Sequence, residues 1–245
     1  MMRRVGRPRR APSGRRELVI GEYAKYDLAR AERTGVPEVI LAEGKSVEHL
    51  VGILRALARE GRGALVSRPT PAQRRRLRQE VTRGLAIVEL ASGRLLRLNG
   101  PLVDPPPTGR VALLAAGTAD VPVAEEARAL LESSGVSTVV AYDIGVAGIH
   151  RLTRALARLE RKRPRVYLVF AGREGALPTI VAGLVHGPVV GIPTSVGYGR
   201  GGRGEAALLA MLQSCAPVAV MNIDAAVPAA LFALQLLGRD FPRQG

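Results

Sequence analysis

The sequence predicts an α/β protein in which a smaller N-terminal α/β domain precedes a doubly wound, three-layer domain with a five-stranded parallel sheet. After residue 110, short apolar runs rich in β-branched residues alternate with amphipathic segments, which is typical of repeated βαβ units. A Pro- and Gly-rich segment at 101–109 would interrupt any helix or central strand, so it indicates a linker. An apolar fraction of 47% in 245 residues is sufficient for a substantial core.

The expected organisation follows from these features and from the charge. We expect a basic leader at 1–16, a small N-terminal α/β domain at 17–100, the linker at 101–109 and the larger domain at 110–245. In the N-terminal domain, Ser46 is suited to cap a helix that Gly61 would end. The elements expected there are helices at 21–34, 47–60 and 71–81 and strands at 36–41, 64–67 and 84–90.

In the larger domain, the apolar runs predict five strands and the segments between them predict helices. The order of the strands within the sheet cannot be read from one sequence. The expected strands are 111–115, 138–141, 166–170, 189–192 and 218–221, and the expected helices are 123–132, 149–161, 176–185, 205–212 and 229–237.

Composition excludes several classes of protein. One cysteine cannot form a disulfide framework or a multi-thiolate zinc site, and 3% aromatic residues without Trp argue against an RNA-stacking surface. No apolar stretch is long enough to span a membrane, and no hydrophobic run follows the basic start, so a cytoplasmic location is expected. Much of the net charge of +15 lies in the first 110 residues, which carry 23 Lys and Arg against 11 Asp and Glu. We interpret the Arg-rich leader as a solvated segment, and a nucleic-acid partner is not expected, although a non-enzymatic nucleic-acid-binding protein remains an alternative.

Each expected strand of the larger domain is followed by a polar or glycine-rich turn. In a parallel sheet these turns meet at the carboxyl ends of the strands, where backbone N–H groups and hydroxyls can bind an anion. No P-loop and no Gly-x-Gly-x-x-Gly after the first strand is present, so the turns indicate a nucleotide or sugar-phosphate site of another kind. The candidate substrate-binding residues in these turns are Gly117, Thr118, Asp120, Asp143, Gly145, Gly172, Ser195, Gly197, Tyr198 and Gly199.

Several long segments in these turns and upstream of them resemble one family. They are AGTADVPVAEEA, YDIGVAGIHRL, AGREGALPTIVAGLV, PTSVGYGRGG and ALLAMLQSCA, with YDLARAERTGVPEVILAEGK upstream. Together they resemble the LarB family, whose C-terminal half is similar to the PurE family of aminoimidazole ribonucleotide carboxylases. The resemblance implies carboxylation of the pyridinium ring of nicotinic acid adenine dinucleotide and hydrolysis of its phosphoanhydride. The products would be pyridinium-3,5-biscarboxylic acid mononucleotide, an intermediate of nickel-pincer nucleotide synthesis, and AMP.

The resemblance also implies roles for particular residues. Cys215, the single thiol, would add to the ring, and Glu174 would act as the proton shuttle. His150 and Arg151 stand where the purine enzymes carry a Ser-Ala-His-Arg element, so a phosphate or substrate role is expected. A further set would hold the phosphates or carboxylate of the dinucleotide, and its first three members share a helical face by their spacing: Asp27, Arg30, Arg33, Glu38 and Lys45. Mg²⁺ is the expected cofactor, with metal ligands unknown, and carbon dioxide or bicarbonate is the expected co-substrate.

Three features qualify this resemblance. Cys215 precedes the fifth expected strand and so should lie at the amino end of the sheet, so we expect it to complete a neighbouring subunit's site in a homo-oligomer. The family's usual continuation after Asn222-Ile223-Asp224 is replaced by Ala225-Ala226-Val227-Pro228, and Arg173 replaces a usual apolar residue. An aminoimidazole ribonucleotide carboxylase or mutase is the alternative enzyme, although the turn before Pro178 lacks the histidine typical of those enzymes.

Overall fold

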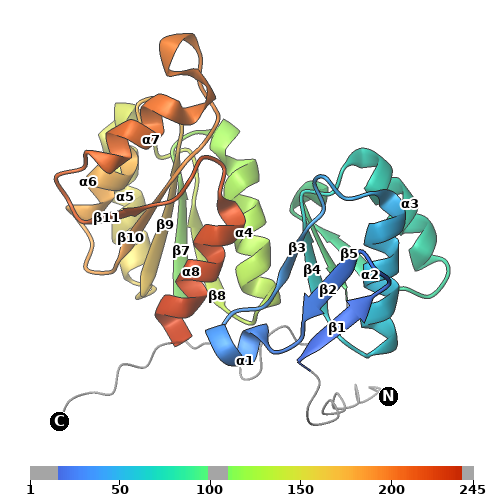
Figure 1. Ribbon diagram of the computed structural model, residues 1–245. Helices are drawn as coiled ribbons and strands as arrows, with labels where there is room; N and C mark the ends of the chain where they lie inside the picture. The colour runs from blue at the N-terminus through green and yellow to red at the C-terminus, as the bar shows by residue number, and fades with distance from the viewer. Residues whose placement is uncertain (1–15, 99–109, 239–245) are drawn as a thin grey trace, which may run out of the picture. The chain divides into compact units, whose positions relative to one another are not determined.

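The structure is a computed structural model that describes residues 16–98 and 110–238, and it divides into two compact units, 1–104 and 105–245. Residues 1–15 of the expected leader at 1–16 and the whole of the expected linker at 101–109 lie outside the described residues. Within the described ranges, no helix is long and apolar enough to cross a membrane. Each unit has its own hydrophobic core, and Figure 1 shows the helices and strands of both.

The second unit is the doubly wound domain that the sequence predicts. Its five parallel strands are β7 (Arg110–Ala115), β8 (Ser137–Ala141), β9 (Val166–Ala171), β10 (Val189–Pro193) and β11 (Val218–Val220). Their order in the sheet is β11-β10-β9-β7-β8, so the direction of strand addition reverses between β7 and β9. Ligands of such open sheets bind at the carboxyl ends of the strands beside this reversal.

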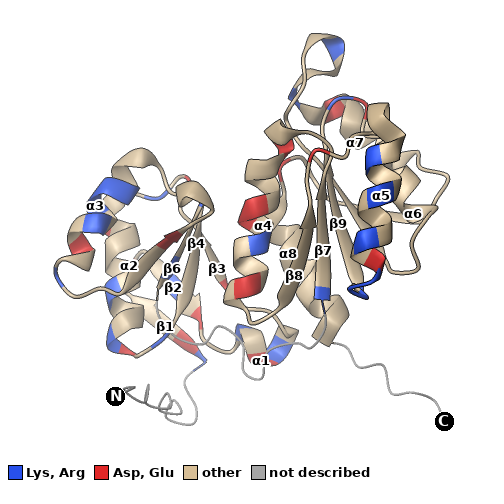
Figure 2. Cartoon of the chain, turned by 180° about the vertical axis from the view of Figure 1, so that it is seen from behind, with Lys and Arg blue, Asp and Glu red and all other residues tan. Residues whose placement is uncertain are grey.

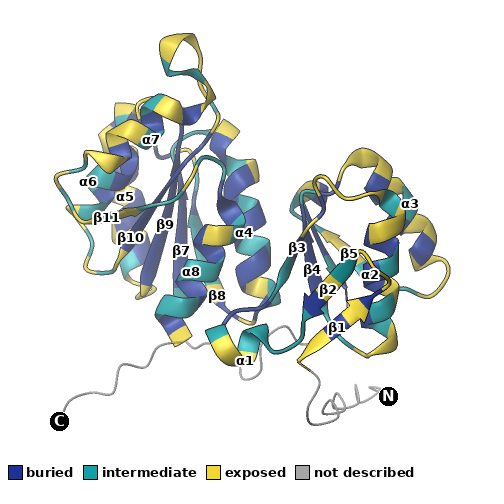
Figure 3. Ribbon diagram, in the orientation of Figure 1, coloured by how far each residue is buried: buried dark blue, intermediate teal, exposed yellow. Residues whose placement is uncertain are grey.

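Helices cover both faces of this sheet. The helices are α4 (Val121–Ser133), α5 (Ile149–Glu160), α6 (Leu177–Ala182), α7 (Glu205–Leu212) and α8 (Ala226–Gly238). In Figure 1, α4 and α8 lie side by side on one face, and α5, α6 and α7 lie on the other. The helices shield both faces of the sheet from solvent, and every residue of β9 and β10 is buried (Figure 3).

The expected boundaries in this unit agree with the structure to within three residues. The two largest differences are in α6 and α8. Helix α6 ends at Ala182 and not at residue 185, because Gly183 follows it and a turn leads into β10. Helix α8 starts three residues earlier than expected, at Ala226, because Pro228 is tolerated in a first helical turn, where its missing N–H has no intrahelical partner.

The first unit contains a four-stranded sheet in the order β3-β4-β6-β5 and a separate hairpin. The sheet comprises β3 (Val39–Leu41), β4 (Ala64–Ser67), β5 (Ile87–Leu90) and β6 (Leu95–Leu98). Its helices are α2 (Val47–Arg59), capped by Ser46 as expected, and α3 (Pro71–Val81), whose Thr70 and Gln73 form a reciprocal capping box. Strand β6 is missing from the sequence prediction, and β5 starts at Ile87 because a turn occupies residues 82–84.

The expected helix at 21–34 is wrong. This segment forms the second half of an antiparallel hairpin, β1 (Glu17–Ile20) with β2 (Ala24–Asp27), followed by one short helix, α1 (Arg30–Thr34). In β1, which precedes the segment expected to be helical, exposed and buried residues alternate, and Leu18 and Ile20 lie in the core, as in a strand. Residues 24–27 pair with β1 and are therefore extended as well. Asp27 therefore does not share a helical face with Arg30 and Arg33.

Candidate functional site

A cavity of about 590 Å³ opens at the carboxyl ends of β7, β8 and β9, beside the reversal of strand order. The turns after these three strands and the starts of α5 and α6 supply most of its walls, and Val196 from the turn after β10 completes them. Eight residues expected to bind substrate or shuttle a proton lie in this lining: Gly117, Thr118, Asp120, Asp143, Gly145, Arg151, Gly172 and Glu174. The topology of the sheet thus brings together side chains from three separate parts of the chain.

Asp120 holds two of the loops around the cavity in place. Its carboxylate is 4% exposed, and its Oδ2 accepts a hydrogen bond from the backbone N–H of Gly117 at 2.8 Å. Its Oδ1 accepts one from the hydroxyl of Thr194, which is fully buried, at 2.5 Å. Both carboxylate oxygens are engaged within the protein, so the contribution of Asp120 is to join the turn after β7 to the turn after β10. Sequence reasoning missed Thr194, because its burial depends on packing between strands far apart in the chain.

Glu174 lies at the mouth of the cavity, in a turn that is fixed by its glycines. Gly175 N–H donates to the carbonyl of Gly172 at 2.9 Å, which closes the turn. A Cβ on Gly172 would lie 2.3 Å from the carbonyl oxygen of Val196, and Gly175 has a φ of +64° with Ala207 directly beside it. The side chain of Glu174 is 62% exposed, so it is free to meet a ligand in the cavity.

Asp143 and Arg151 form an ion pair at the opposite wall, with 2.7 Å between Arg151 Nη1 and Asp143 Oδ2. Asp143 has a φ of +55°, and two other non-glycine residues in turns after strands of this unit, Arg173 and Asp224, also have positive φ values. Such conformations cost free energy in residues that carry a Cβ, and they cluster at functional sites. The turns after β8, β9 and β11 therefore share a feature that the sequence does not show.

Other candidates lie near this site without lining the cavity. His150 is exposed at the start of α5. The backbone N–H of Ser195 donates to Asp224 Oδ1 at 3.0 Å, and the exposed loop of Gly197, Tyr198 and Gly199 leads away from Val196, which does line the cavity.

Cys215 is exposed and lies in the turn between α7 and β11. Because all five strands are parallel, this turn belongs to the amino-terminal edge of the sheet, opposite to the edge that forms the cavity. Neighbouring Ser214 caps the turn, since its hydroxyl accepts from Thr179 and donates to the carbonyl of Ala216. The thiol is therefore accessible from outside the subunit, but the subunit's own cavity does not include it.

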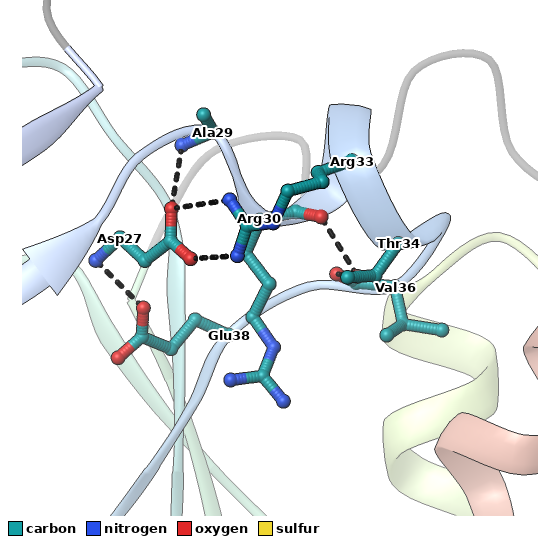
Figure 4. A network of polar contacts seen from close by, with 7 residues as sticks. All are labelled: Asp27, Ala29, Arg30, Arg33, Thr34, Val36 and Glu38. Carbon is teal, nitrogen blue, oxygen red and sulfur yellow. Dashed lines mark hydrogen bonds and ion pairs between the residues drawn. The ribbon is translucent and has the colours of Figure 1, made fainter.

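The candidates of the first unit form a second polar cluster (Figure 4). Arg33 makes two hydrogen bonds to the carboxylate of Asp27, the shorter at 2.6 Å, and the carboxylate of Glu38 accepts from the backbone N–H of Asp27 at 2.7 Å. Arg30 Nε is buried and has no hydrogen-bond partner among the described residues. Lys45 is set slightly apart, with its ammonium group donating to the carbonyl of Leu41 at 2.9 Å.

Hydrogen bonding and burial shift the pKa values of the two carboxylates of this cluster in opposite directions. The hydrogen bonds from Arg33 lower the pKa of Asp27. Burial raises the pKa of Glu38, and this effect outweighs the hydrogen bond from Asp27 and the nearby Arg30 and Lys45. The cluster therefore combines an ionised carboxylate with one that is easier to protonate, and the Arg30 guanidinium is left with hydrogen-bonding capacity for an anion.

No group of three or more His, Cys, Asp or Glu side chains that could hold a metal ion occurs among residues 16–98 and 110–238. The residues present do not form a cage for Mg²⁺, which usually retains waters and binds through one or two carboxylates and substrate phosphates.

The division of the chain into two units agrees with comparisons to known proteins. The AIR carboxylase family model matches residues 110–243, and the LarB/PurE-like N-terminal domain model matches residues 18–95. An uncharacterized protein of Methanocaldococcus jannaschii is 38% identical over 217 residues, covering 87% of this chain and 84% of that protein. The N5-carboxyaminoimidazole ribonucleotide mutase of Pyrococcus horikoshii is 36% identical over 138 residues, covering 54% of this chain and 74% of the mutase. A solved PurE structure from Treponema denticola is 25% identical with a TM-score of 0.42, covering 51% of this chain and 76% of that one.

The fold and the site thus define an enzyme of the carboxylase and mutase type, built on a PurE-like domain. The chain belongs to the LarB-like family, in which this domain follows a LarB/PurE-like N-terminal domain.

Proposed function

We propose that the protein carboxylates the pyridinium ring of nicotinic acid adenine dinucleotide and hydrolyses its phosphoanhydride, giving pyridinium-3,5-biscarboxylic acid mononucleotide and AMP. The observation that carries this proposal is the pairing of two domains in one chain. The AIR carboxylase family model matches residues 110–243, whereas the LarB/PurE-like N-terminal domain model matches residues 18–95, outside that range. The N-terminal domain carries a polar cluster of its own, and this favours a substrate larger than a mononucleotide.

The chemical difficulty is that a pyridinium ring is electron-poor and does not attack carbon dioxide. Addition of a thiolate to the ring gives a neutral dihydropyridine, whose enamine carbon is nucleophilic and forms the new bond to carbon dioxide. Removal of the proton from that carbon and departure of the thiolate restore the aromatic ring. The net change is exchange of one ring proton for one carboxylate, so neither oxidant nor reductant is consumed.

Cys215 is the only thiol in the chain and therefore the proposed nucleophile. Its exposed position at the amino-terminal edge of the sheet supports delivery to the cavity of a neighbouring subunit. Leu209 and Leu212 lie one helical turn apart on α7, shortly before Cys215, and are 58% and 62% exposed. Apolar side chains gathered on one exposed face are typical of a protein–protein interface.

The remaining residues have roles that follow from their surroundings. Glu174, exposed at the mouth of the cavity, is the proposed acceptor of the ring proton. Arg30, with its unpartnered Nε, is proposed to bind the dinucleotide phosphates together with the Asp27–Arg33 pair, Glu38 and Lys45. Mg²⁺ would enter with those phosphates and ease cleavage of the anhydride, but we assign it no protein ligands.

The test is to incubate the protein with nicotinic acid adenine dinucleotide, ¹³C-bicarbonate and Mg²⁺ and to analyse the mixture by mass spectrometry. We expect a labelled dicarboxylated mononucleotide and an equal amount of AMP. Cys215→Ser should give no labelled product while retaining its circular dichroism spectrum. Intact substrate with the wild-type protein would refute the proposal, and conversion of N5-carboxyaminoimidazole ribonucleotide in a parallel reaction would favour a mutase.

A further inference from the structure

Two arginines line the cavity, and their side chains are bound very differently. Arg151 is paired with Asp143 at 2.7 Å. The guanidinium of Arg173 makes no hydrogen bond to any described residue, and its closest acidic partner is Glu174, with 3.8 Å between Nε and Oε2. Its main contact is the face of the Tyr198 ring, 4.8 Å from the ring centroid. Arg173 is therefore the cavity arginine whose N–H donors are still available.

The backbone holds this guanidinium at the mouth of the cavity. Arg173 has a φ of +49°, and its N–H donates to the carbonyl of Val196 at 3.1 Å. The preceding Gly172 is packed so closely against Val196 that no side chain could replace its hydrogen. The packing fixes the backbone of this turn. Within it the side chains of Arg173 and Glu174 lie side by side, and the Tyr198 ring contacts one face of the guanidinium.

A guanidinium with available N–H donors is suited to binding a carboxylate. It offers a planar pair of N–H donors that can bind both carboxylate oxygens, and such charged hydrogen bonds are stronger than an exposed contact with an aromatic ring. A neutral carboxamide of the same shape offers one oxygen and places an N–H₂ group opposite the second donor, so it binds less well.

We infer that Arg173 binds the ring carboxylate of the substrate and thereby selects a nicotinic acid dinucleotide over the corresponding nicotinamide dinucleotide. This inference rests on the proposed function. Because Glu174 is adjacent, a ring held through its carboxylate by Arg173 would bring a neighbouring ring carbon towards the proposed proton acceptor. Tyr198 is a positioning residue, since it contacts the guanidinium and holds it ready at the cavity mouth.

The experiment compares the two dinucleotides in wild type and in Arg173→Met, both by calorimetric binding and by kcat/KM. In wild type we expect clear preference for the acid. In Arg173→Met the preference should fall about 10- to 100-fold, as expected for loss of a charge-assisted hydrogen bond. The affinity and kcat/KM for the acid should decrease, whereas those for the amide should change little. Arg173→Lys should recover part of the preference, and Tyr198→Leu should weaken it less than Arg173→Met.

Arg200→Met is the matched control, because Arg200 is an exposed arginine of the same loop that does not line the cavity. It should leave the preference unchanged. An equal loss for acid and amide in Arg173→Met, or an unchanged preference, would overturn the inference. Binding that depends on Arg173 and favours the acid, without product formation, would support the inference while refuting the proposed reaction.

Discussion

At the scale of single residues, the cavity depends on a few buried groups whose hydrogen bonds are all made within the protein. Asp120 is the main example, since both of its oxygens accept bonds that join the turns after β7 and β10. The sequence indicated Asp120 as a substrate-binding residue. Its engagement by Gly117 and Thr194 gives it a further role in positioning the walls of the cavity.

Asp120→Asn tests this role. An asparagine has one acceptor oxygen in place of two and adds an N–H₂ group, so either the Gly117 N–H or the Thr194 hydroxyl loses its partner in a buried place. We expect the free energy of unfolding to fall by about 1–3 kcal/mol, which lowers the melting temperature by about 2–10 °C. Thr118→Ala, at an exposed neighbouring position, should leave the melting temperature unchanged. An unaltered melting temperature in Asp120→Asn would show that Asp120 does not hold the turns together.

At the scale of elements, helix α3 of the first unit shows how a strongly basic segment is accommodated. Four of its residues are arginines, visible as the blue band on α3 in Figure 2. Its Glu80 is 1% exposed and accepts hydrogen bonds from Arg55 on α2, from Arg76 on α3 and from Arg83 in the following turn. This carboxylate connects the two helices that cover the sheet.

The charge of Glu80 makes the stability of this unit sensitive to acid. Burial by itself would raise the pKa of Glu80, but the hydrogen bonds from the three arginines outweigh it, and the pKa is lowered. A lowered pKa in the folded state means that the carboxylate stabilises the fold above its unfolded pKa of about 4.3. This contribution is lost as the pH falls through the folded-state value.

We therefore expect wild type to be more stable than Glu80→Gln by about 1–3 kcal/mol near pH 7, with the difference shrinking below about pH 4. Urea unfolding at a series of pH values measures it. Glu48, an exposed glutamate in the first turn of α2, provides the matched control. Glu48→Gln should leave the dependence of the free energy of unfolding on pH unchanged. A difference that stays constant down to pH 3 would contradict the assignment.

At the scale of the whole molecule, the separation of Cys215 from the cavity bears on the proposed assembly. One subunit presents Glu174 at the carboxyl edge of its sheet and Cys215 at the amino edge. If catalysis joins them, each active site must combine the cavity of one subunit with the thiol of another.

Mixed oligomers test this arrangement. Cys215→Ala and Glu174→Gln subunits, each inactive alone, should regain activity when unfolded and refolded together, because some sites then receive an intact thiol and an intact carboxylate. Random mixing in equal amounts should restore about a quarter of the wild-type activity per site. If native mass spectrometry shows that hybrid oligomers form but no activity is recovered, the shared site is refuted. Both groups would then act within one subunit, or one of them would have no part in catalysis.

The fold of the larger domain was predictable from the sequence because buried parallel strands are continuous apolar runs, and every expected strand is present. The first unit was less predictable. Tyr23 and Tyr26 have helical spacing, yet they belong to a hairpin, since Leu18 and Ile20 can reach the core only from a strand. The spacing of apolar residues along a short segment does not show which part of the hydrophobic core the segment will pack against.

The sequence by itself determined which residues end up in the turns after the strands, because strand and turn patterns are local properties of the chain. Only the tertiary structure decided which turns meet. The order β11-β10-β9-β7-β8 brings the turns after β7, β8 and β9 around one cavity and buries Thr194 against Asp120. Among the described residues it leaves the Arg173 guanidinium with the Tyr198 ring and a 3.8 Å contact to Glu174. These outcomes depend on packing between segments distant in the chain, so no local pattern in the sequence contains them.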